Sequence, residues 1–297
     1  MGSPTLKNFA KAVPYPVQKR LLSILDGYHQ GERVGHSHEF LDLEDYRPGD
    51  PIADVDWRAT ARAGHPIIKR FEATAVLTVM LAVDAGSSMA ALAPGESGVP
   101  VEKVRLAGDI EKAIVWLVAM HGDHLGLVAG NAVEMRTLPA RTGLGHGETL
   151  LRIAQAINPD SGPSDFSAVL RRVRAGSKKR SLILGITDET QITGDVVAAL
   201  NRLTQKHKVG LFLIEDFDPT KGSGDISDVA SGLLPDFVGT DEAIRLQWEQ
   251  YTAARRRHVD QLLSAVPLRY ARVGAEDEVL PALIRVLGGL DRGPDFA

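Results

Sequence analysis

Short runs of apolar residues alternate along most of the chain with longer segments in which apolar positions recur every three or four residues. The short runs predict buried strands at residues 76–83, 182–186, 209–214 and 268–273. The periodic segments predict helices at residues 102–120, 148–157, 166–174, 196–206, 242–264 and 279–287. Strands that alternate with helices form a mostly parallel sheet with helices on both faces. The pattern therefore predicts an α/β fold that begins near residue 75.

Two regions depart from this alternation. Residues 125–129 and 133–138 predict two short strands joined by a turn at Gly130-Asn131. Before residue 75, the pattern predicts one amphipathic helix at residues 17–28 and one short strand at residues 67–71. We therefore expect a small N-terminal module at residues 1–74 and an α/β domain at residues 75–297.

Composition is that of an ordinary globular protein, with 44% hydrophobic and 24% charged residues in a chain of 297. The net charge of -4 argues against bulk attraction to nucleic acid or anionic membranes. Because the sequence has no cysteine, disulfides, thiolate zinc sites and cysteine nucleophiles are excluded. The chain also shows no membrane-spanning apolar run and no signal-peptide core. We expect a cytoplasmic protein.

Oxygen-bearing side chains occur at three points where the chain leaves or enters the predicted sheet. These residues are Asp84, Ser87 and Ser88, then Ser164 and Asp165, then Thr187 and Asp188. In a doubly wound sheet such exits gather at one edge, and carboxylates with hydroxyls suit a hard cation such as Mg²⁺. The same residue types also cap the helix that follows a strand, and spacing alone favours that interpretation.

Several motifs resemble a bacterial family. Residues 84–89, Asp-Ala-Gly-Ser-Ser-Met, are similar to the Asp-x-Ser-x-Ser motif of von Willebrand factor A domains. Upstream, Tyr-Arg-Pro-Gly-Asp at 46–50 and Asp-Trp-Arg-Ala-Thr-Ala-Arg at 56–62 resemble the signature of domain of unknown function 58. This resemblance, from about residue 31 onward, implies a Rossmann-like, von Willebrand factor A-like domain preceded by a small family-specific module. Genes of this family usually neighbour genes for MoxR-type AAA+ ATPases, which implies a partner or adaptor role.

The resemblance also implies a metal-ion-dependent adhesion-type site, but an incomplete one. Asp84 matches the motif's aspartate and Ser88 its second serine, while Ser164 and Asp188 stand where the A domain places its threonine and last aspartate. Gly86 stands in place of the first serine, so one direct ligand is missing. These four residues are the candidate Mg²⁺ ligands, with reduced affinity expected. A site that works without metal is the alternative.

The upstream signature concentrates charged and aromatic side chains in a short span: Arg47, Asp50, Asp56, Trp57, Arg58 and Arg62. One interpretation is a structural network in which Asp54 or Asp56 pairs with Arg58 or Arg62, and Trp57 anchors the module. The other is a recognition surface, because Trp and Arg are typical hot-spot residues. We favour the network, since a small module with little core needs such contacts to hold its shape.

Three functions are compatible with these features. We favour a non-catalytic protein-interaction module that binds a MoxR-type AAA+ ATPase through its Asp84 edge, and we assign no catalytic residue. The first alternative is a magnesium-dependent phosphoester hydrolase, although no general base is evident beside Asp84. The second is an anion or nucleic-acid binder acting through basic clusters at residues 171–180 and 255–258. The helix dipole explains the first cluster, and we interpret the second as a solvated helix face.

Overall fold

The structure, a computed structural model of the whole chain, describes residues 15–31, 39–47, 50, 52, 55–72, 76–221, 227–228, 232–233 and 241–290. These residues divide into two units. The smaller unit is Asp26–Leu77, and the larger unit contains the remaining described residues.

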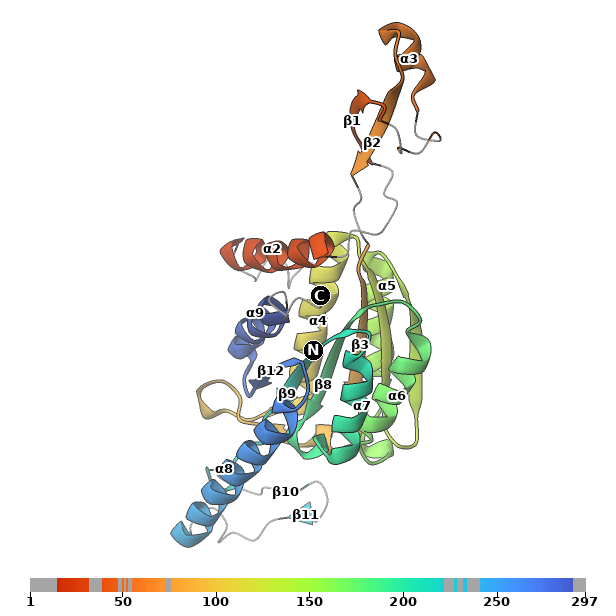
Figure 1. Cartoon of the computed structure of the whole chain (residues 1–297). Coiled ribbons are helices and arrows are strands. Elements are labelled where there is room, and N and C mark those ends of the chain that lie inside the picture. The colour runs from red at the N-terminus through yellow and green to blue at the C-terminus, as the bar shows by residue number, and fades with distance from the viewer. Residues whose placement is uncertain are drawn as a thin grey trace. The chain divides into compact units, whose positions relative to one another are not determined.

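A six-stranded sheet forms the centre of the larger unit (Figure 1). In spatial order its strands are β12 (Arg269–Val273), β9 (Lys208–Ile214), β8 (Leu182–Asp188), β3 (Thr78–Asp84), β6 (His124–Gly130) and β7 (Met135–Arg141). All are parallel except β7, which runs antiparallel to β6. The chain passes from β3 to β6 on one side and later returns to β8 on the other. The carboxyl ends of β3 and β8 therefore meet at a topological switch point, where α/β proteins usually place their sites.

Helices cover both faces of this sheet. The helices α4 (Lys103–His121), α5 (Leu144–Gln155) and α9 (Val279–Leu290) form one layer, and α6 (Phe166–Gly176), α7 (Gly194–Thr204) and α8 (Glu242–Ser264) form the other. Met80 and Ala82 of β3 belong to the hydrophobic core under the second layer. Because side chains alternate along a strand, Val79, Leu81 and Val83, each 3% exposed or less, face the first layer. The predicted α/β fold with helices on both faces is confirmed.

Short elements complete the larger unit at the ends of the main strands and helices. They are η2 (Ser87–Ala90), β4 (Leu92–Ala93), η3 (Glu96–Gly98), β5 (Val101–Glu102), η4 (Pro159–Ser161), η5 (Glu189–Gln191), η6 (Pro219–Lys221), β10 (Ser227–Asp228), β11 (Gly232–Leu233) and η8 (Glu276–Glu278). Within the described ranges, no helix combines the length and apolar character that crossing a bilayer requires.

The helix α5 begins four residues before the predicted start at residue 148. Its glycines are part of the helix because of how it packs on α4. A Cβ atom on Gly147 would lie 2.4 Å from Cγ1 of Val115, so glycine allows the two helices to approach closely. Gly143 ends the preceding segment at φ 100°, a conformation that favours glycine.

The first described helix, α2 (Tyr15–Gly31), begins in the larger unit, whereas we expected residues 1–74 to form one module. Leu21 and Leu25 on its apolar face are each 1% exposed. The carbonyl of Leu22 lies 3.1 Å from Nε2 of His121 at the end of α4. An amphipathic helix gains more by covering the core of a large domain than by packing on a short hairpin, because burial stabilises in proportion to apolar area.

The smaller unit contains β1 (Glu39–Asp45), α3 (Trp57–Ala63) and β2 (Ile67–Glu72). The two strands pair antiparallel, with Phe40 opposite Phe71 and Asp45 opposite Ile67. The predicted strand at residues 67–71 corresponds to β2, whereas β1 and α3 were not predicted.

Candidate functional site

Asp84 is the last residue of β3 and lies at the switch point of the sheet. Its Oδ1 atom accepts a hydrogen bond of 3.0 Å from the N–H of Gly86. Its Oδ2 atom accepts one of 3.0 Å from the hydroxyl of Thr187, which lies on the neighbouring strand β8. The carboxylate is therefore held by residues that are distant in sequence.

Ser88 and Ser164 meet beside this aspartate. Ser88 lies in η2 and Ser164 precedes α6, yet their Oγ atoms are 2.8 Å apart. The Ser164 hydroxyl also acts to lower the pKa of Asp84, and the Ser88 hydroxyl acts to lower that of Asp188, so each serine lies beside one of the carboxylates. The structure thus brings together all four candidate ligand residues from three separate segments.

Asp188 pairs with a buried lysine that sequence reasoning did not find. Lys103 begins α4 and is 1% exposed, and its Nζ atom lies 3.0 Å from Oδ2 of Asp188. The same ammonium group donates to Asp216, just beyond the end of β9. Asp188 Oδ1 accepts from the N–H and the hydroxyl of Thr190. The site therefore contains a cation supplied by the chain itself.

Burial and charge set the protonation of these groups. Burial raises the pKa of Asp84 to about 6, and the nearby Asp188 charge acts in the same direction, against the hydrogen bonds from Gly86 and Thr187. Burial also opposes ionisation of Asp188, but the Lys103 ammonium and the hydrogen bond from Thr190 together lower the Asp188 pKa. The Asp188 and Asp216 carboxylates likewise raise the pKa of Lys103 against the effect of its burial. Asp188 and Lys103 are thus a charged pair, whereas no Lys, Arg or His among the described residues forms an ion pair with Asp84.

The carboxylates are not exposed at the surface. Asp84 is 1% exposed and Asp188 is 0% exposed, while Ser88 and Ser164 are half-buried above them. A partner that reaches this edge in the described conformation meets the serine hydroxyls first.

Gly86 explains why the first serine of the motif is missing. A Cβ atom at this position would lie 2.4 Å from both the Cα and the N atom of Ser164. The backbone that carries Ser164 therefore occupies the space that a serine side chain at position 86 would need. The glycine and the Ser88–Ser164 contact belong to the same close approach of two loops.

Helix capping accounts for part of the oxygen cluster, as the alternative interpretation expected. Asp165 accepts from the N–H of Ala168 at 2.9 Å and begins α6. Asp188 also caps the short helix η5 through Thr190. Capping does not explain Asp84, whose second oxygen is bound across the sheet by Thr187.

The signature residues of the smaller unit make local contacts that differ from the pairing we expected. Asp56 accepts from the N–H groups of Arg58 and Ala59 at the start of α3, and its other oxygen lies 3.4 Å from Nζ of Lys69. A carboxylate at this position stabilises the exposed N–H groups of a first helical turn, so it is a cap rather than an arginine partner. Asp54 lies outside the described residues.

The remaining signature residues that the structure describes are exposed or make a local hydrogen bond. The N–H of Arg47 donates to Asp50 Oδ2 at 2.9 Å. Arg58 and Arg62 are exposed, and Trp57 is 68% exposed.

The basic cluster at residues 255–258 is not simply a solvated face. Arg255 is only 17% exposed in its side chain and pairs with Asp216, the second partner of Lys103. Nη2 of Arg256 lies 2.8 Å from Oε1 of Glu215. Arg256, Arg257 and His258 are exposed, as a solvated face implies, whereas Arg255 departs from that interpretation because it is mostly buried against the acidic end of β9.

A family model described as "Protein of unknown function DUF58" matches residues 42–258. The chain belongs to this family. It is 26% identical over 304 residues to an uncharacterized protein of Mycobacterium bovis, covering 99% of this chain and 92% of the relative. The predicted family resemblance is confirmed.

Solved structures similar to the DUF58 chain include an aerotolerance-related membrane protein from Bacteroides fragilis, with a TM-score of 0.47 and 18% identity over 72% of this chain and 99% of that chain. A von Willebrand factor type A structure from Catenulispora acidiphila has a TM-score of 0.42 and 10% identity, covering 76% of this chain and 44% of that chain.

The donor set of this DUF58 site fits a hard cation of modest affinity. Two carboxylates and two hydroxyls converge, and they are the oxygen ligands that Mg²⁺ and Ca²⁺ take. Asp84, whose pKa is raised by burial, would be stabilised by a cation. Against high affinity, Asp188 already shares its charge with Lys103. In the part of the chain that the structure describes, no three His, Asp or Glu side chains gather as metal ligands. A metal would therefore depend on the serine hydroxyls.

Proposed function

We propose that this DUF58 protein is a non-catalytic interaction module that binds a protein partner at the carboxyl edge of its sheet, with a MoxR-type AAA+ ATPase as that partner. The observation that carries the proposal is the convergence of Asp84, Ser88, Ser164 and Asp188 from three segments. The resemblance to a family whose genes neighbour those of such ATPases supports the choice of partner. The cysteine-free composition is in keeping with a cytoplasmic location, which we include in the proposal.

In this proposal the serines form the contact surface and the aspartates hold it in place. Ser88 and Ser164 are half-buried and have hydroxyls that can donate to a carboxylate of the partner. Asp84, Ser88 and Ser164 would hold Mg²⁺, which when bound supplies a positive charge for that carboxylate. Asp188 stays with Lys103, and the Ser88 hydroxyl lies near it and acts to lower its pKa.

The signature of the smaller unit provides a second contact surface in the proposal. Trp57 is a large apolar side chain that is 68% exposed beside exposed Arg58 and Arg62. Solvent-exposed tryptophan and arginine are the residues that most often carry binding energy at interfaces. This observation favours the recognition-surface interpretation over a purely structural role for these three residues.

The test is direct binding of the purified ATPase to the immobilised full chain, in Mg²⁺ and in chelator. We expect the double substitution Ser88→Ala/Ser164→Ala to weaken binding at least about tenfold, which corresponds to loss of one good polar contact. Asp84→Asn keeps the shape of the side chain and removes its charge, so binding in Mg²⁺ should fall to the value measured in chelator.

The matched control is Ser167→Ala, which removes a half-buried hydroxyl on α6 that bonds Asp165 rather than the four-residue cluster. Its binding should equal that of the wild type. If the wild type, the double serine variant and Asp84→Asn bind the ATPase with equal affinity, this edge of the sheet is not the binding site.

A further inference from the structure

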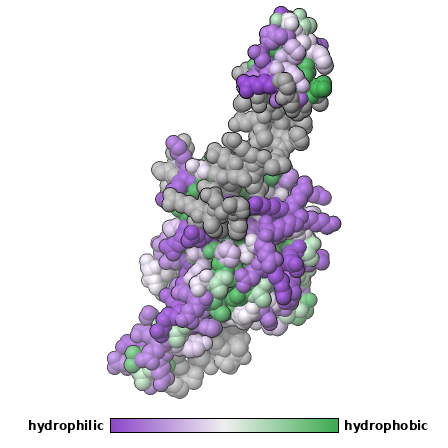
Figure 2. Space-filling model, viewed as in Figure 1, coloured by the Kyte–Doolittle hydropathy of each residue, from purple (hydrophilic) through white to green (hydrophobic). Residues whose placement is uncertain are grey.

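A groove between α6 and α7 lies on the helical layer that carries the first basic cluster. It has a volume of about 620 Å³, within the range of small-molecule sites. Its polar lining includes Arg171 and Arg174 from α6, Arg202 from α7, and Ser177, Lys206 and His207 at the ends of these helices. We call this feature the α6–α7 groove. The surface over these two helices is largely hydrophilic (Figure 2).

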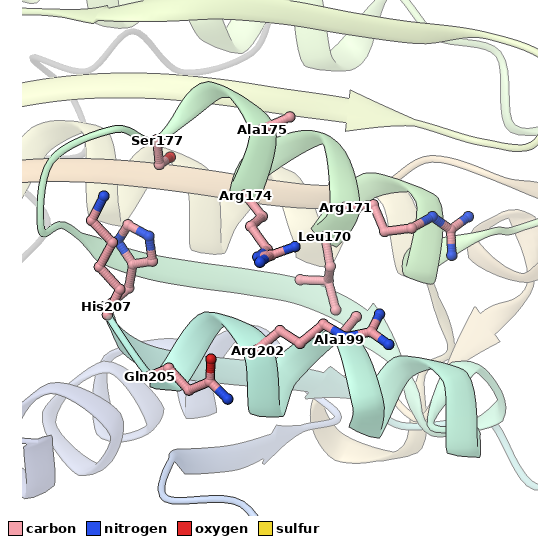
Figure 3. Close-up of a pocket in the computed structure, with 10 residues that line it drawn as sticks. Leu170, Arg171, Arg174, Ala175, Ser177, Ala199, Arg202, Gln205 and His207 are labelled. Atoms are coloured by element: carbon pink, nitrogen blue, oxygen red, sulfur yellow. The ribbon is translucent and has the colours of Figure 1, made fainter.

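Four permanently cationic side chains line this groove, and no aspartate or glutamate is among its described lining residues. Figure 3 shows Arg174 pointing from α6 toward α7, and Arg202 lying along α7 in the space between the helices. In ordinary surfaces both signs of charge are interspersed, and like charges that face each other repel. The groove therefore concentrates positive potential. Burial, with the charges of Lys206 and Arg180, lowers the pKa of His207.

Two guanidinium groups of the groove, one from each helix, are available. Arg174 and Arg202 are exposed and form no hydrogen bond or ion pair with a described residue. Arg171 is committed in part, since it donates to Ser167 Oγ at 2.8 Å and lies 3.8 Å from Asp165. The Lys206 ammonium donates to the carbonyl of Lys178.

Buried polar atoms without partners lie at one end of the groove. His207 is 5% exposed and Ser177 is 9% exposed, yet Nδ1 of His207 and Oγ of Ser177 have no hydrogen-bond partner among the described residues. Figure 3 shows both side chains where α6 ends and where the chain leaves α7. Polar side chains therefore extend the basic lining to this end of the groove.

We propose that the α6–α7 groove binds a diphosphate group. Guanidinium pairs bind phosphate oxygens through parallel hydrogen bonds, which a lysine surface does less specifically. Four cations match the charge of two phosphoryl groups better than that of one, since one carries about -1.5 to -2 near neutral pH. Leu170 and Ala199 are apolar lining residues, and the described lining contains no Phe, Tyr or Trp on which a nucleobase could stack. The diphosphate itself, rather than a nucleotide base, is therefore the recognised part.

Calorimetric titration of the full chain with inorganic pyrophosphate, in a buffer without divalent cations, tests the proposal. We expect saturable binding of one pyrophosphate per chain, at least about tenfold tighter than orthophosphate, and weakening as salt rises. The double substitution Arg174→Gln/Arg202→Gln should weaken pyrophosphate binding at least about tenfold, since it removes both free guanidinium groups. Both side chains are exposed, so the variant is expected to keep the wild-type melting temperature, measured alongside.

The matched control is Arg152→Gln/Arg245→Gln, which removes the same charge from exposed positions on α5 and α8 outside the groove. Its affinity for pyrophosphate should stay within about twofold of the wild type. Equal weakening by the two double variants would show attraction to net charge alone and would overturn the proposal. Absence of saturable pyrophosphate binding would also overturn the proposal. So would saturable binding of a polyglutamate peptide that is lost in the Arg174→Gln/Arg202→Gln variant and is not displaced by pyrophosphate.

Discussion

Lys103 supplies the sharpest test of how the candidate site is held together. The substitution Lys103→Met removes the ammonium group and keeps an unbranched apolar side chain of similar length. Two carboxylates then lose their shared cation: Asp188, which is 0% exposed, and Asp216, which is 21% exposed in its side chain. Asp216 keeps Arg255, whereas Asp188 keeps hydrogen bonds from Thr190 but has no second counterion among the described residues.

The expected cost follows from this difference. Removing one partner of a buried ion pair leaves an uncompensated charge and costs about 3–5 kcal/mol. Because Asp216 remains paired, most of this cost falls on Asp188. A domain of ordinary stability unfolds with about 5–15 kcal/mol, so the variant should lose a large share of its stability. The difference in stability between wild type and variant should shrink in acid. The pKa of Asp188 is lowered in the folded wild type, so its ionised form stabilises the fold above the ordinary aspartate pKa of about 3.9. This stabilisation is lost as the pH falls through the lowered pKa of the folded state.

Urea unfolding followed by circular dichroism measures the effect. Lys112→Met is the matched control, because Lys112 lies on the same helix and is also mostly buried. Its partner, Asp109, lies one turn away on that helix and has a side chain that is 16% exposed. We expect Lys112→Met to cost about 1 kcal/mol or less. The double variant Lys103→Met/Asp188→Asn should recover most of the lost stability, since it removes the unpaired charge. A loss below about 1 kcal/mol for Lys103→Met, or no recovery in the double variant, would refute the ion-pair account.

Three further outcomes are expected. Burial raises the pKa of Glu111 to about 8, so the folded chain holds a proton that the unfolded chain releases above about pH 4.5. The free energy of unfolding should therefore fall as pH rises from about 4.5 to about 8. Glu111→Gln should add about 1–3 kcal/mol at pH 8 and make the free energy of unfolding, measured in urea at several pH values, less dependent on pH in this range. Gly86→Ser should cost about 1–3 kcal/mol in thermal unfolding, because its Cβ would overlap the Ser164 backbone, and an unchanged melting temperature would contradict the close approach of the two loops. Trp57→Ala should change stability by less than about 0.5 kcal/mol while weakening capture of the ATPase, and a large loss of stability with unchanged capture would assign the tryptophan a structural role.

Local pattern in the sequence was sufficient for most of the sheet and its helices. Strand segments such as 209–214 and helices such as 242–264 were found because strands and helices place apolar residues at periods that are visible within a few residues. The same reasoning placed Asp84 and Asp188 at strand ends, and parallel strands carry their ends to one edge. The α5 start was missed because a run with several glycines indicates a turn locally, whereas here Gly147 serves the contact with Val115.

What tertiary structure decided is the chemistry of the site. Lys103 pairs with Asp188 across 85 positions of sequence, and no local period connects the two. A signal was present, since a lysine in the first turn of a helix opposes the helix dipole and suggests a carboxylate partner, but the sequence does not say which one. Gly86 indicated a missing ligand, and only the folded backbone shows that Ser164 occupies its space. The amino-acid sequence alone determined which elements form, because periodicity is local, while the partners of each buried charge depend on the packing of segments far apart in the chain.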